Sequence, residues 1–389
     1  MKKIDVLLIS RPDHSYNIYK SLLENNLSFV YMVFKLFPKW LNRIIAKNRL
    51  REIYDNCSIC WSMTLINTLH YNLGWNWLSK IPESDVYQPH IRRFLWRHTP
   101  RLIHYWPEYC TDLMRKYKQK NPDAKTLAEI VFLNEQFVLD ENAEYLTYIG
   151  LGKNLEYIKK NNEITKRVME FETDFMVPSQ LVADSFKKYY PNKKYHIVSY
   201  GIPVLPNYKK KKHIQHSSEV VDFVYAGKIS IEKGCDLLCQ YFSCHPEKHI
   251  HLYGNIHHNE RHLFEQYKQY TNITFYGSVP KVKLQSLLIQ YNAGIHLSRF
   301  DSFSLAVAEV IGCGVPVIVS NRTGICSDVE KINAGVVTQL DKDSIENSID
   351  LFCNPVNYNK YIDSIDNYIN TPHKTYGDNI VDLYRSLIS

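Results

Sequence analysis

The second half of the sequence alternates short apolar runs with segments of helical periodicity. The apolar runs include residues 221–227, 249–254, 273–277, 293–298 and 315–320, and helical segments such as 257–270 and 281–290 lie between them. Strands that are apolar on both faces and separated by helices are typical of a parallel sheet covered on both sides. Crossovers between such strands are right-handed. The alternation therefore predicts an α/β fold with a doubly wound sheet.

The first half of the chain shows the same alternation less regularly. A run from 201 to 218 with two prolines and four consecutive lysines separates the halves and is typical of a linker. A chain of 389 residues is long enough for two such domains. Ligands of open α/β sheets bind at the carboxyl ends of the strands, so the chemistry should lie where two domains face each other across a cleft. In the first half, strands are expected at 4–9, 29–33, 102–104, 127–132, 174–177 and 196–199.

The composition is that of a globular protein, 45% hydrophobic and 22% charged, with a formal net charge of +7. This basic excess suits nucleic acid, an anionic membrane surface or an anionic small molecule, and equally a solvated basic surface. The apolar run 4–9 is too short for a signal peptide and contains Asp5, so we read it as a buried strand. No run approaches the ~20 apolar residues of a membrane span. Nine cysteines without disulfide-framework spacing fit a reducing compartment, and we expect a cytoplasmic protein.

The stretch 298–320, SRFDSFSLAVAEVIGCGVPVIVS, follows an expected strand and opens a helix near Phe303. A helix N-terminus presents free backbone N–H groups and a partial positive charge, which together suit a phosphate group. The alternative is that Asp301 or Ser302 only caps an ordinary helix.

Glu309 lies in the middle of this apolar helix. Its helical neighbours Leu305, Ala306, Gly312 and Cys313 cannot pair with a charge. An unpaired buried carboxylate costs several kcal/mol. Glu309 therefore points to a solvent edge or meets a polar group supplied from outside, and we favour ligand hydroxyls such as those of a ribose.

Lys228 and Lys233 follow the first strand of the second domain. Both should stand at the carboxyl edge of the sheet, where phosphates need countercharge. A single loop lysine is usually only a solvated charge. No Walker loop occurs, the first loop of the chain has no GxGxxG pattern, and we find no set of metal ligands.

These motifs taken together resemble those of a known family. The order YAGKISIEKG, LYGNI, ITFYGSVP and GIHLSRFDSFSLAVAEVIGCGVPVIVSN resembles the C-terminal domain of glycosyltransferase family four, which has the GT-B fold. EFETDFMVPSQLVADSF followed by HIVSYGIP is similar to the end of that family's N-terminal domain. The resemblance implies an N-terminal acceptor-binding domain at 1–202 and a nucleotide-sugar-binding domain at 203–373. It also implies a C-terminal helix, 374–389, that packs back on the first domain.

The resemblance also assigns roles to residues. The family's pair of acids falls on Asp301, expected to touch the donor sugar, and on Glu309, expected to hold the ribose hydroxyls. Asp301 is one methylene shorter than the usual Glu, and Lys228 replaces a more usual Arg. The implied catalytic residues are Lys228, Lys233, Asp301, Glu309 and His104. The implied donor-binding residues are Gly227, Lys228, Lys233, Gly254, Phe303, Ser304, Leu305 and Glu309.

The acceptor is expected in the N-terminal domain. Its first loop, with Arg11, Asp13 and His14, and the strand end at His104 occupy the corresponding topological positions. This chain lacks the glycines that the family often has in the first loop. Capping and surface roles are the alternatives for Asp13, His14 and His104.

The segment 33–51 interleaves aromatic and aliphatic residues with six basic ones. A basic amphipathic helix of this kind can lie in a membrane interface. The alternative is a helix packed on the core with a solvated basic side. With the membrane interpretation, the acceptor is a lipid-linked glycan at the cytoplasmic face of the inner membrane, and the enzyme is a peripheral membrane protein.

The function implied is transfer of a sugar from a nucleoside-diphosphate sugar to a glycan or lipid-linked glycan, with retention of the anomeric configuration. Bacterial surface polysaccharide synthesis, of O-antigen or capsule, is the expected pathway, and no metal or other cofactor is expected. The alternatives are a non-catalytic GT-B partner protein and a sugar-nucleotide epimerase on the same fold. A nucleic-acid binder ranks last, because no RNA-binding or helix-turn-helix pattern is evident.

Overall fold

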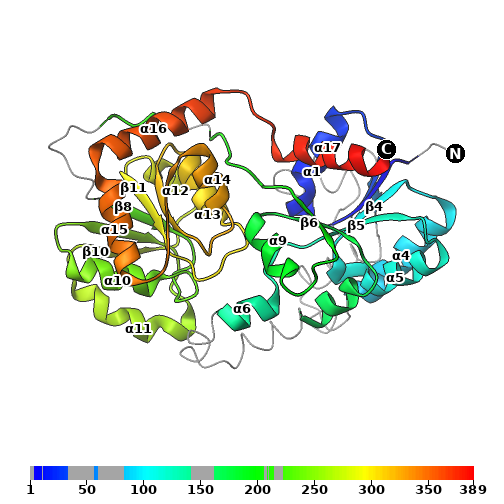
Figure 1. The fold of residues 1–389 in the computed structure, drawn as a ribbon, viewed down its shortest axis with the longest axis horizontal. Coiled ribbons are helices and arrows are strands. Elements are labelled where there is room, and N and C mark those ends of the chain that lie inside the picture. The colour runs from blue at the N-terminus through cyan, green and yellow to red at the C-terminus, as the bar shows by residue number, and fades with distance from the viewer. Residues whose placement is uncertain are drawn as a thin grey trace, which may run out of the picture.

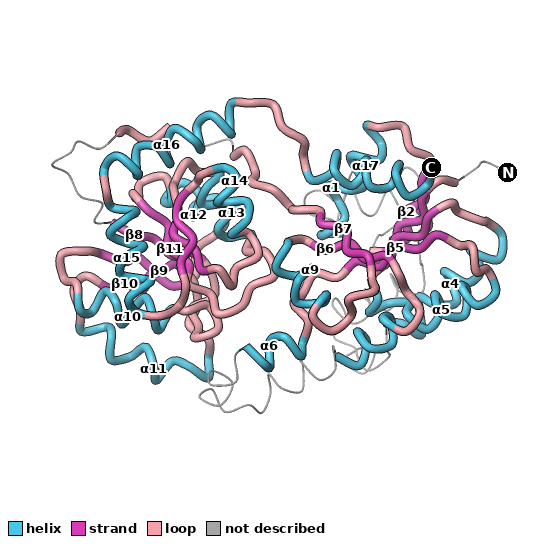
Figure 2. Tube along the Cα trace, in the orientation of Figure 1, coloured by secondary structure: helices cyan, strands magenta, loops and turns pink. Residues whose placement is uncertain are grey.

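The computed structural model describes residues 4–10, 12–33, 57–59, 83–141, 162–205, 208, 210–213 and 222–389. They form two α/β domains, each built on one sheet whose strands all pair in parallel (Figure 1). Figure 2 shows the strands as two separate groups with helices around each. The predicted class, two doubly wound α/β domains, is confirmed.

The N-terminal sheet has seven strands in the order β3-β2-β1-β4-β5-β6-β7. Its two central strands, β1 and β4, are buried along their whole length, because helices cover both faces of the sheet. The strands are β1 (Val6–Ile9), β2 (Phe29–Val33), β3 (Cys57–Ile59), β4 (Leu102–Tyr105), β5 (Lys125–Glu129), β6 (Asp174–Val177) and β7 (Lys194–Ile197). The helices are α1 (Pro12–Glu24), α4 (Glu83–Arg97), α5 (Pro107–Lys120), α6 (Glu135–Glu141) and α9 (Gln180–Lys187).

The C-terminal sheet has six strands in the order β10-β9-β8-β11-β12-β13. The chain enters at β8 in the middle, winds outward to β10, and then crosses to β11 on the other side. This reversal places the loops after β8 and β11 next to each other at the carboxyl edge. The strands are β8 (Asp222–Ala226), β9 (His249–Tyr253), β10 (Ile273–Gly277), β11 (Ala293–His296), β12 (Val317–Ser320) and β13 (Gly335–Thr338). The helices are α10 (Cys235–Cys244), α11 (Arg261–Glu265), α12 (Lys281–Leu288), α13 (Leu305–Gly312), α14 (Cys326–Ile332), α15 (Lys342–Cys353) and α16 (Pro355–Asn370).

The last helix, α17 (Tyr376–Ile388), returns to the N-terminal domain and lies beside α1 (Figure 1). Thr375 and Asp378 form a reciprocal capping box that begins it. Its apolar stripe, which includes Ile380 and Tyr384, is buried in the core cluster that also holds residues of β1, β2 and β4. The N-terminal core is thus completed by residues from the far end of the chain.

Several sequence expectations differ from the structure or fall outside it. Strands β3 and β13 were not predicted, and the single helix expected at 257–270 is broken into a short α-helix between two 3₁₀ turns. The segment proposed to touch a membrane lies outside the described residues apart from Val33. Within the described ranges, no helix is both long and apolar enough to cross a membrane.

Candidate active site

Glycines bring three loops together at the carboxyl edge of the C-terminal sheet. Gly254, after β9, has a φ of +150°, and a Cβ there would lie 1.7 Å from the carbonyl oxygen of Gly227, after β8. Gly234 has a φ of +68°, and a Cβ there would lie 1.8 Å from the carbonyl oxygen of Leu297, after β11. These contacts are possible only without side chains. The loop after β8 is therefore packed between the backbone after β9 and the backbone after β11.

Lys233 lies at the centre of this edge. Its Nζ is 3.0 Å from Asp301 Oδ2 and 3.4 Å from Glu232 Oε1. Burial alone lowers the pKa of the Lys233 ammonium, but the two carboxylates outweigh burial and hold that pKa above its ordinary value. Lys228 is half exposed and lies 3.9 Å from Glu232 Oε2. The structure therefore brings together Lys228, Lys233 and Asp301, as expected, and adds Glu232, which was not predicted.

The turn before α13 joins Asp301 to the helix N-terminus. Asp301 Oδ1 accepts a hydrogen bond from the backbone N–H of Phe303 at 3.3 Å. Ser304 follows with a φ of +76°, a left-handed conformation that a residue with a Cβ adopts at a cost. The amides of the first turn of α13 have no partner inside the helix, and the side chain of the N-cap residue Ser304 does not cap them. Leu305, the first helical residue, is 59% exposed. This end of α13 is open and electrostatically suited to an anion.

Glu309 has a partner that its own helix could not supply. Lys281, at the start of α12, forms an ion pair with Glu309 Oε1. The Glu309 side chain is 21% exposed, whereas Lys281 is well exposed. The sequence analysis considered a solvent edge or an outside ligand for this carboxylate, and the structure adds a cation from the neighbouring helix. The assignment of Glu309 to ribose hydroxyls stays a prediction, and a ligand would have to compete with Lys281 for the carboxylate.

His104 lies in the core and not at the surface of a cleft. Its side chain in β4 is fully buried, with Nδ1 bonded to the hydroxyl of Tyr384 on α17. Its Nε2 lies 3.3 Å from Glu129 Oε2 without hydrogen-bond geometry. This position gives no support to a catalytic role. Arg11 lies outside the described residues, and Asp13 and His14 lie in the first turn of α1 with side chains outside the described part.

Two buried, uncharged polar side chains, His296 and Tyr225, lie near the charged groups of the site. His296 in β11 is buried against Tyr225, with ring centroids 4.9 Å apart. Burial lowers the pKa of His296 to about 4, so its imidazole is neutral at physiological pH. The Tyr225 hydroxyl donates to the carbonyl oxygen of Lys228 at 2.7 Å and holds that loop.

Arg299, another residue that sequence reasoning missed, ties the loops after β8 and β11 together. Its guanidinium makes two 2.7 Å bonds to the carboxylate of Asp236 at the start of α10. It also donates to the carbonyl oxygen of Ile231. Bidentate pairs of this kind fix orientation as well as distance. The sequence signal for Arg299 was its place two residues before Asp301, directly after an expected strand.

The N-terminal domain contacts the loop that carries Asp301. Ser179 Oγ, at the start of α9, donates to the carbonyl oxygen of Ser302 at 2.7 Å. Arg322 pairs with Glu141 of α6 at 2.8 Å. A Cβ at Gly324 would lie 2.0 Å from the same Ser302 oxygen, so the backbones pack closely there. The candidate site therefore lies beside the junction of the two domains.

This architecture and part of the sequence are similar to those of known proteins. Residues 207–363 match the family described as glycosyl transferases group 1. The chain is 22% identical over 203 residues to the putative colanic acid biosynthesis glycosyl transferase WcaC of Escherichia coli (strain K12), covering 49% of this chain and 46% of that protein. The chain spans less than half the length of the curated relatives it matches.

Two solved structures show the same arrangement over nearly the whole chain. Sucrose-phosphate synthase from Thermosynechococcus elongatus has a TM-score of 0.63 at 14% identity, covering 99% of both chains. HepE from Anabaena, solved with UDP and glucose, has a TM-score of 0.55 at 12% identity, covering 99% of this chain and 100% of its own.

The two Rossmann-like domains thus form a GT-B fold. Residues 207–363, most of the C-terminal domain, are similar to glycosyl transferases group 1, and the chain as a whole resembles a glycosyltransferase of the family-four type.

Proposed function

We propose that this protein is a retaining glycosyltransferase. It takes a sugar from a nucleoside-diphosphate sugar and moves it to a glycan or lipid-linked glycan in bacterial surface polysaccharide synthesis, at the cytoplasmic face of the inner membrane. The similarity to WcaC, named for colanic acid biosynthesis, supports the pathway, and the similarity to HepE, solved with UDP and glucose, supports a nucleotide-sugar donor.

One observation carries the proposal. Two ammonium groups, Lys228 and Lys233, and the open amides at the start of α13 meet at one edge of the C-terminal sheet. A diphosphate placed there is held by backbone N–H groups and by two lysine ammonium groups. Protein phosphate sites are built from the same parts.

These residues also supply what glycosyl transfer requires. As the bond between sugar and diphosphate breaks, negative charge grows on the leaving group, and preorganised cations and amides stabilise it. Lys233 is already oriented by Asp301 and Glu232, so little reorganisation is needed when charge develops. With attack on the face from which the diphosphate leaves, a diphosphate oxygen accepts the acceptor's proton. No metal and no strong base is then required.

Ligand binding redistributes the ion pairs of the site in this proposal. A diphosphate that engages Lys233 releases Asp301 to bond hydroxyls of the donor sugar. A ribose that reaches Glu309 competes with Lys281, which lies on the exposed side of the carboxylate.

The test is calorimetric binding of UDP, GDP and ADP, followed by product analysis with the corresponding sugar nucleotides. Micromolar binding of one nucleoside diphosphate and release of that diphosphate from its sugar would support the proposal. Binding without turnover on any donor would favour the non-catalytic partner. Conversion of the sugar without transfer or hydrolysis would favour the epimerase.

A further inference from the structure

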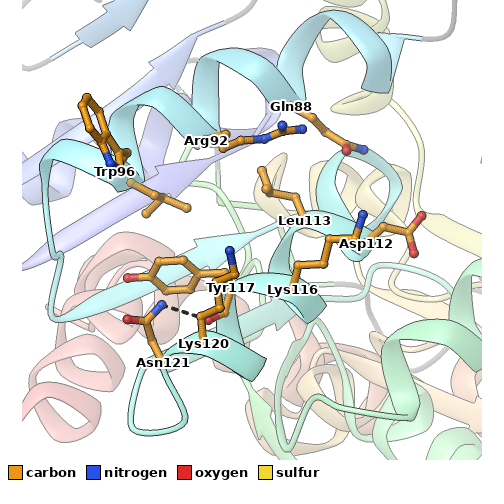
Figure 3. A pocket seen from close by; sticks show the side chains of 10 residues that line it. Gln88, Arg92, Trp96, Asp112, Leu113, Lys116, Tyr117, Lys120 and Asn121 are labelled. Carbon is orange, nitrogen blue, oxygen red and sulfur yellow. Dashed lines mark hydrogen bonds between the residues drawn. The ribbon is translucent and has the colours of Figure 1, made fainter.

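A hollow lies between helices α4 and α5 of the N-terminal domain. Its volume is ≈ 370 Å³, within the range of small-molecule sites. Figure 1 shows both helices on the side of this domain away from the C-terminal domain, so the hollow is separate from the candidate active site. Figure 3 shows α4 above it and α5 below. The lining residues are Gln88, Arg92, Leu95, Trp96, Asp112, Leu113, Lys116, Tyr117, Lys120 and Asn121.

The walls of the hollow carry positive charge from both helices. Arg92 comes from α4, and Lys116 and Lys120 come from α5 (Figure 3). All three side chains are exposed, and none forms an ion pair within the described part of the chain. Like charges on facing walls repel one another at close range, and an anion between them removes that repulsion.

The carboxylate in the lining does not neutralise these cations. Asp112 Oδ1 lies 2.9 Å from Arg115, and its Oδ2 lies 3.2 Å from Arg167, two arginines outside the lining. Its charge is therefore already matched elsewhere. The hollow has a net positive lining with cations free to engage a ligand.

The rim of the hollow carries an exposed aromatic ring. Trp96, in the last turn of α4, is 83% exposed, although a buried indole would gain about 2 kcal/mol or more from leaving water. Tyr117 lies in the floor, half-buried, and the Asn121 amide donates to its carbonyl oxygen at 3.0 Å. Gln88 supplies a second amide from α4. Flat apolar faces beside amide groups complement a ligand that has an apolar ring face and hydroxyls at its edge.

We propose that this hollow binds an anionic saccharide, one or a few sugar rings that carry a carboxylate or phosphate. Trp96 packs on the face of a ring, Arg92 and Lys116 pair with the anionic group, and the amides of Gln88 and Asn121 bond hydroxyls. A concave site with cations on opposing walls fits a ring better than it fits the flat surface of a bilayer. Its volume is too small for the extended basic track of a nucleic-acid site.

The site lies on the outer face of the domain, so its occupation does not involve the donor chemistry. An acidic glycan held there stays attached to the protein whether or not it is being extended. Binding at the hollow is therefore measurable in the absence of any nucleotide sugar, and it stands or falls independently of the proposed reaction.

The test uses the full chain and a trimer of galacturonic acid as the probe, with maltotriose as the uncharged counterpart. Calorimetry at low salt should show binding of the acidic trimer that weakens as salt is added, and much weaker binding of maltotriose. Arg92→Ala and Lys116→Ala should each weaken binding by roughly fivefold, and Trp96→Ala by about tenfold. Lys360→Ala, which removes an exposed cation from α16 of the other domain, is the matched control and should leave binding unchanged.

Thermal unfolding of each variant separates loss of the site from loss of the fold, and these exposed substitutions should leave the midpoint within a few degrees of wild type. Equal affinity for the two trimers, or equal affinity of all variants for the acidic one, overturns the proposal. The same holds if vesicles of phosphatidylglycerol and phosphatidylcholine, or a single-stranded DNA, bind in a way that needs Arg92 and Trp96 while the acidic trimer does not bind.

Discussion

Replacing Lys233 with methionine removes the cation at the centre of the candidate site while keeping most of the unbranched side chain. The ammonium lies 3.0 Å from one carboxylate and 3.4 Å from another, and the side chains of Lys233, Asp301 and Glu232 are each 25% exposed or less. Removing one partner of a buried pair costs about 3–5 kcal/mol, whereas exposed pairs contribute about 1 kcal/mol or less. Because the three side chains are partly buried, the cost of removing Lys233 should fall between these two values. We expect Lys233→Met to lower the free energy of unfolding by about 2 kcal/mol, because Asp301 and Glu232 lose the cation that lies between them.

Urea unfolding at neutral pH measures this loss, with Lys228→Met as the matched control. Lys228 is half exposed and 3.9 Å from its carboxylate, so its removal should cost about 0.5 kcal/mol or less. Combining Lys233→Met with Asp301→Asn should recover part of the stability, because the second change removes a carboxylate that the first left uncompensated.

The same variant has a kinetic consequence. In steady-state assays on the donor found to be active, Lys233→Met should depress kcat more than it raises KM, because leaving-group charge is greatest in the transition state. A variant that unfolds at the wild-type urea concentration and keeps wild-type kcat would refute the reasoning on both counts.

Two further predictions concern carboxylates. Glu309→Ala should reduce turnover and donor affinity but lower stability by about 1 kcal/mol or less, because its partner Lys281 is exposed. Steady-state kinetics and thermal unfolding measure these effects, and near-normal kinetics would contradict the ribose role. Glu135 is buried with one oxygen bonded to Thr165, and burial raises its pKa from 4.5 to about 7. The folded state thus binds this proton more tightly than the unfolded state, so the free energy of unfolding should fall as pH rises from about 4.5 through 7. Glu135→Gln should restore about 2 kcal/mol of that free energy at pH ~8 and little at pH ~4. Urea unfolding at both pH values measures the difference, and a gain that does not change with pH would contradict the assignment.

The fold was predictable because parallel strands that are covered on both faces appear in the sequence as continuous apolar runs. β11 and β12 are buried at every position and were expected as continuous apolar runs. β13 was missed because it lies at the edge of its sheet, has four residues, and alternates buried with half-buried positions. Its four residues, GVVT, are too few for the hydrophobic pattern to distinguish a strand from a short loop.

The residues of the candidate site that directly follow strands were predictable from the sequence. Lys233 and Asp301 each follow a strand, and parallel strands bring such loops to one edge. The partner of Glu309 was not predictable, because Lys281 is distant in the chain and sequence does not tell which helices lie side by side. The surroundings of His104 were hidden for the same reason, since Tyr384 reaches it from the last helix.

The return of α17 to the first domain affects how this protein can be made. Domains generally fold in order as the chain is synthesised, the first one while the rest is still being translated. Here the first sheet lacks part of its cover until residues 376–388 have left the ribosome, after the whole second domain. During that interval the surface that Ile380 and Tyr384 later cover is open to water and to chaperones, and the second domain is ready to fold first. A nascent chain stalled before residue 376 should accordingly be cleaved by proteases in its first domain while its second domain resists.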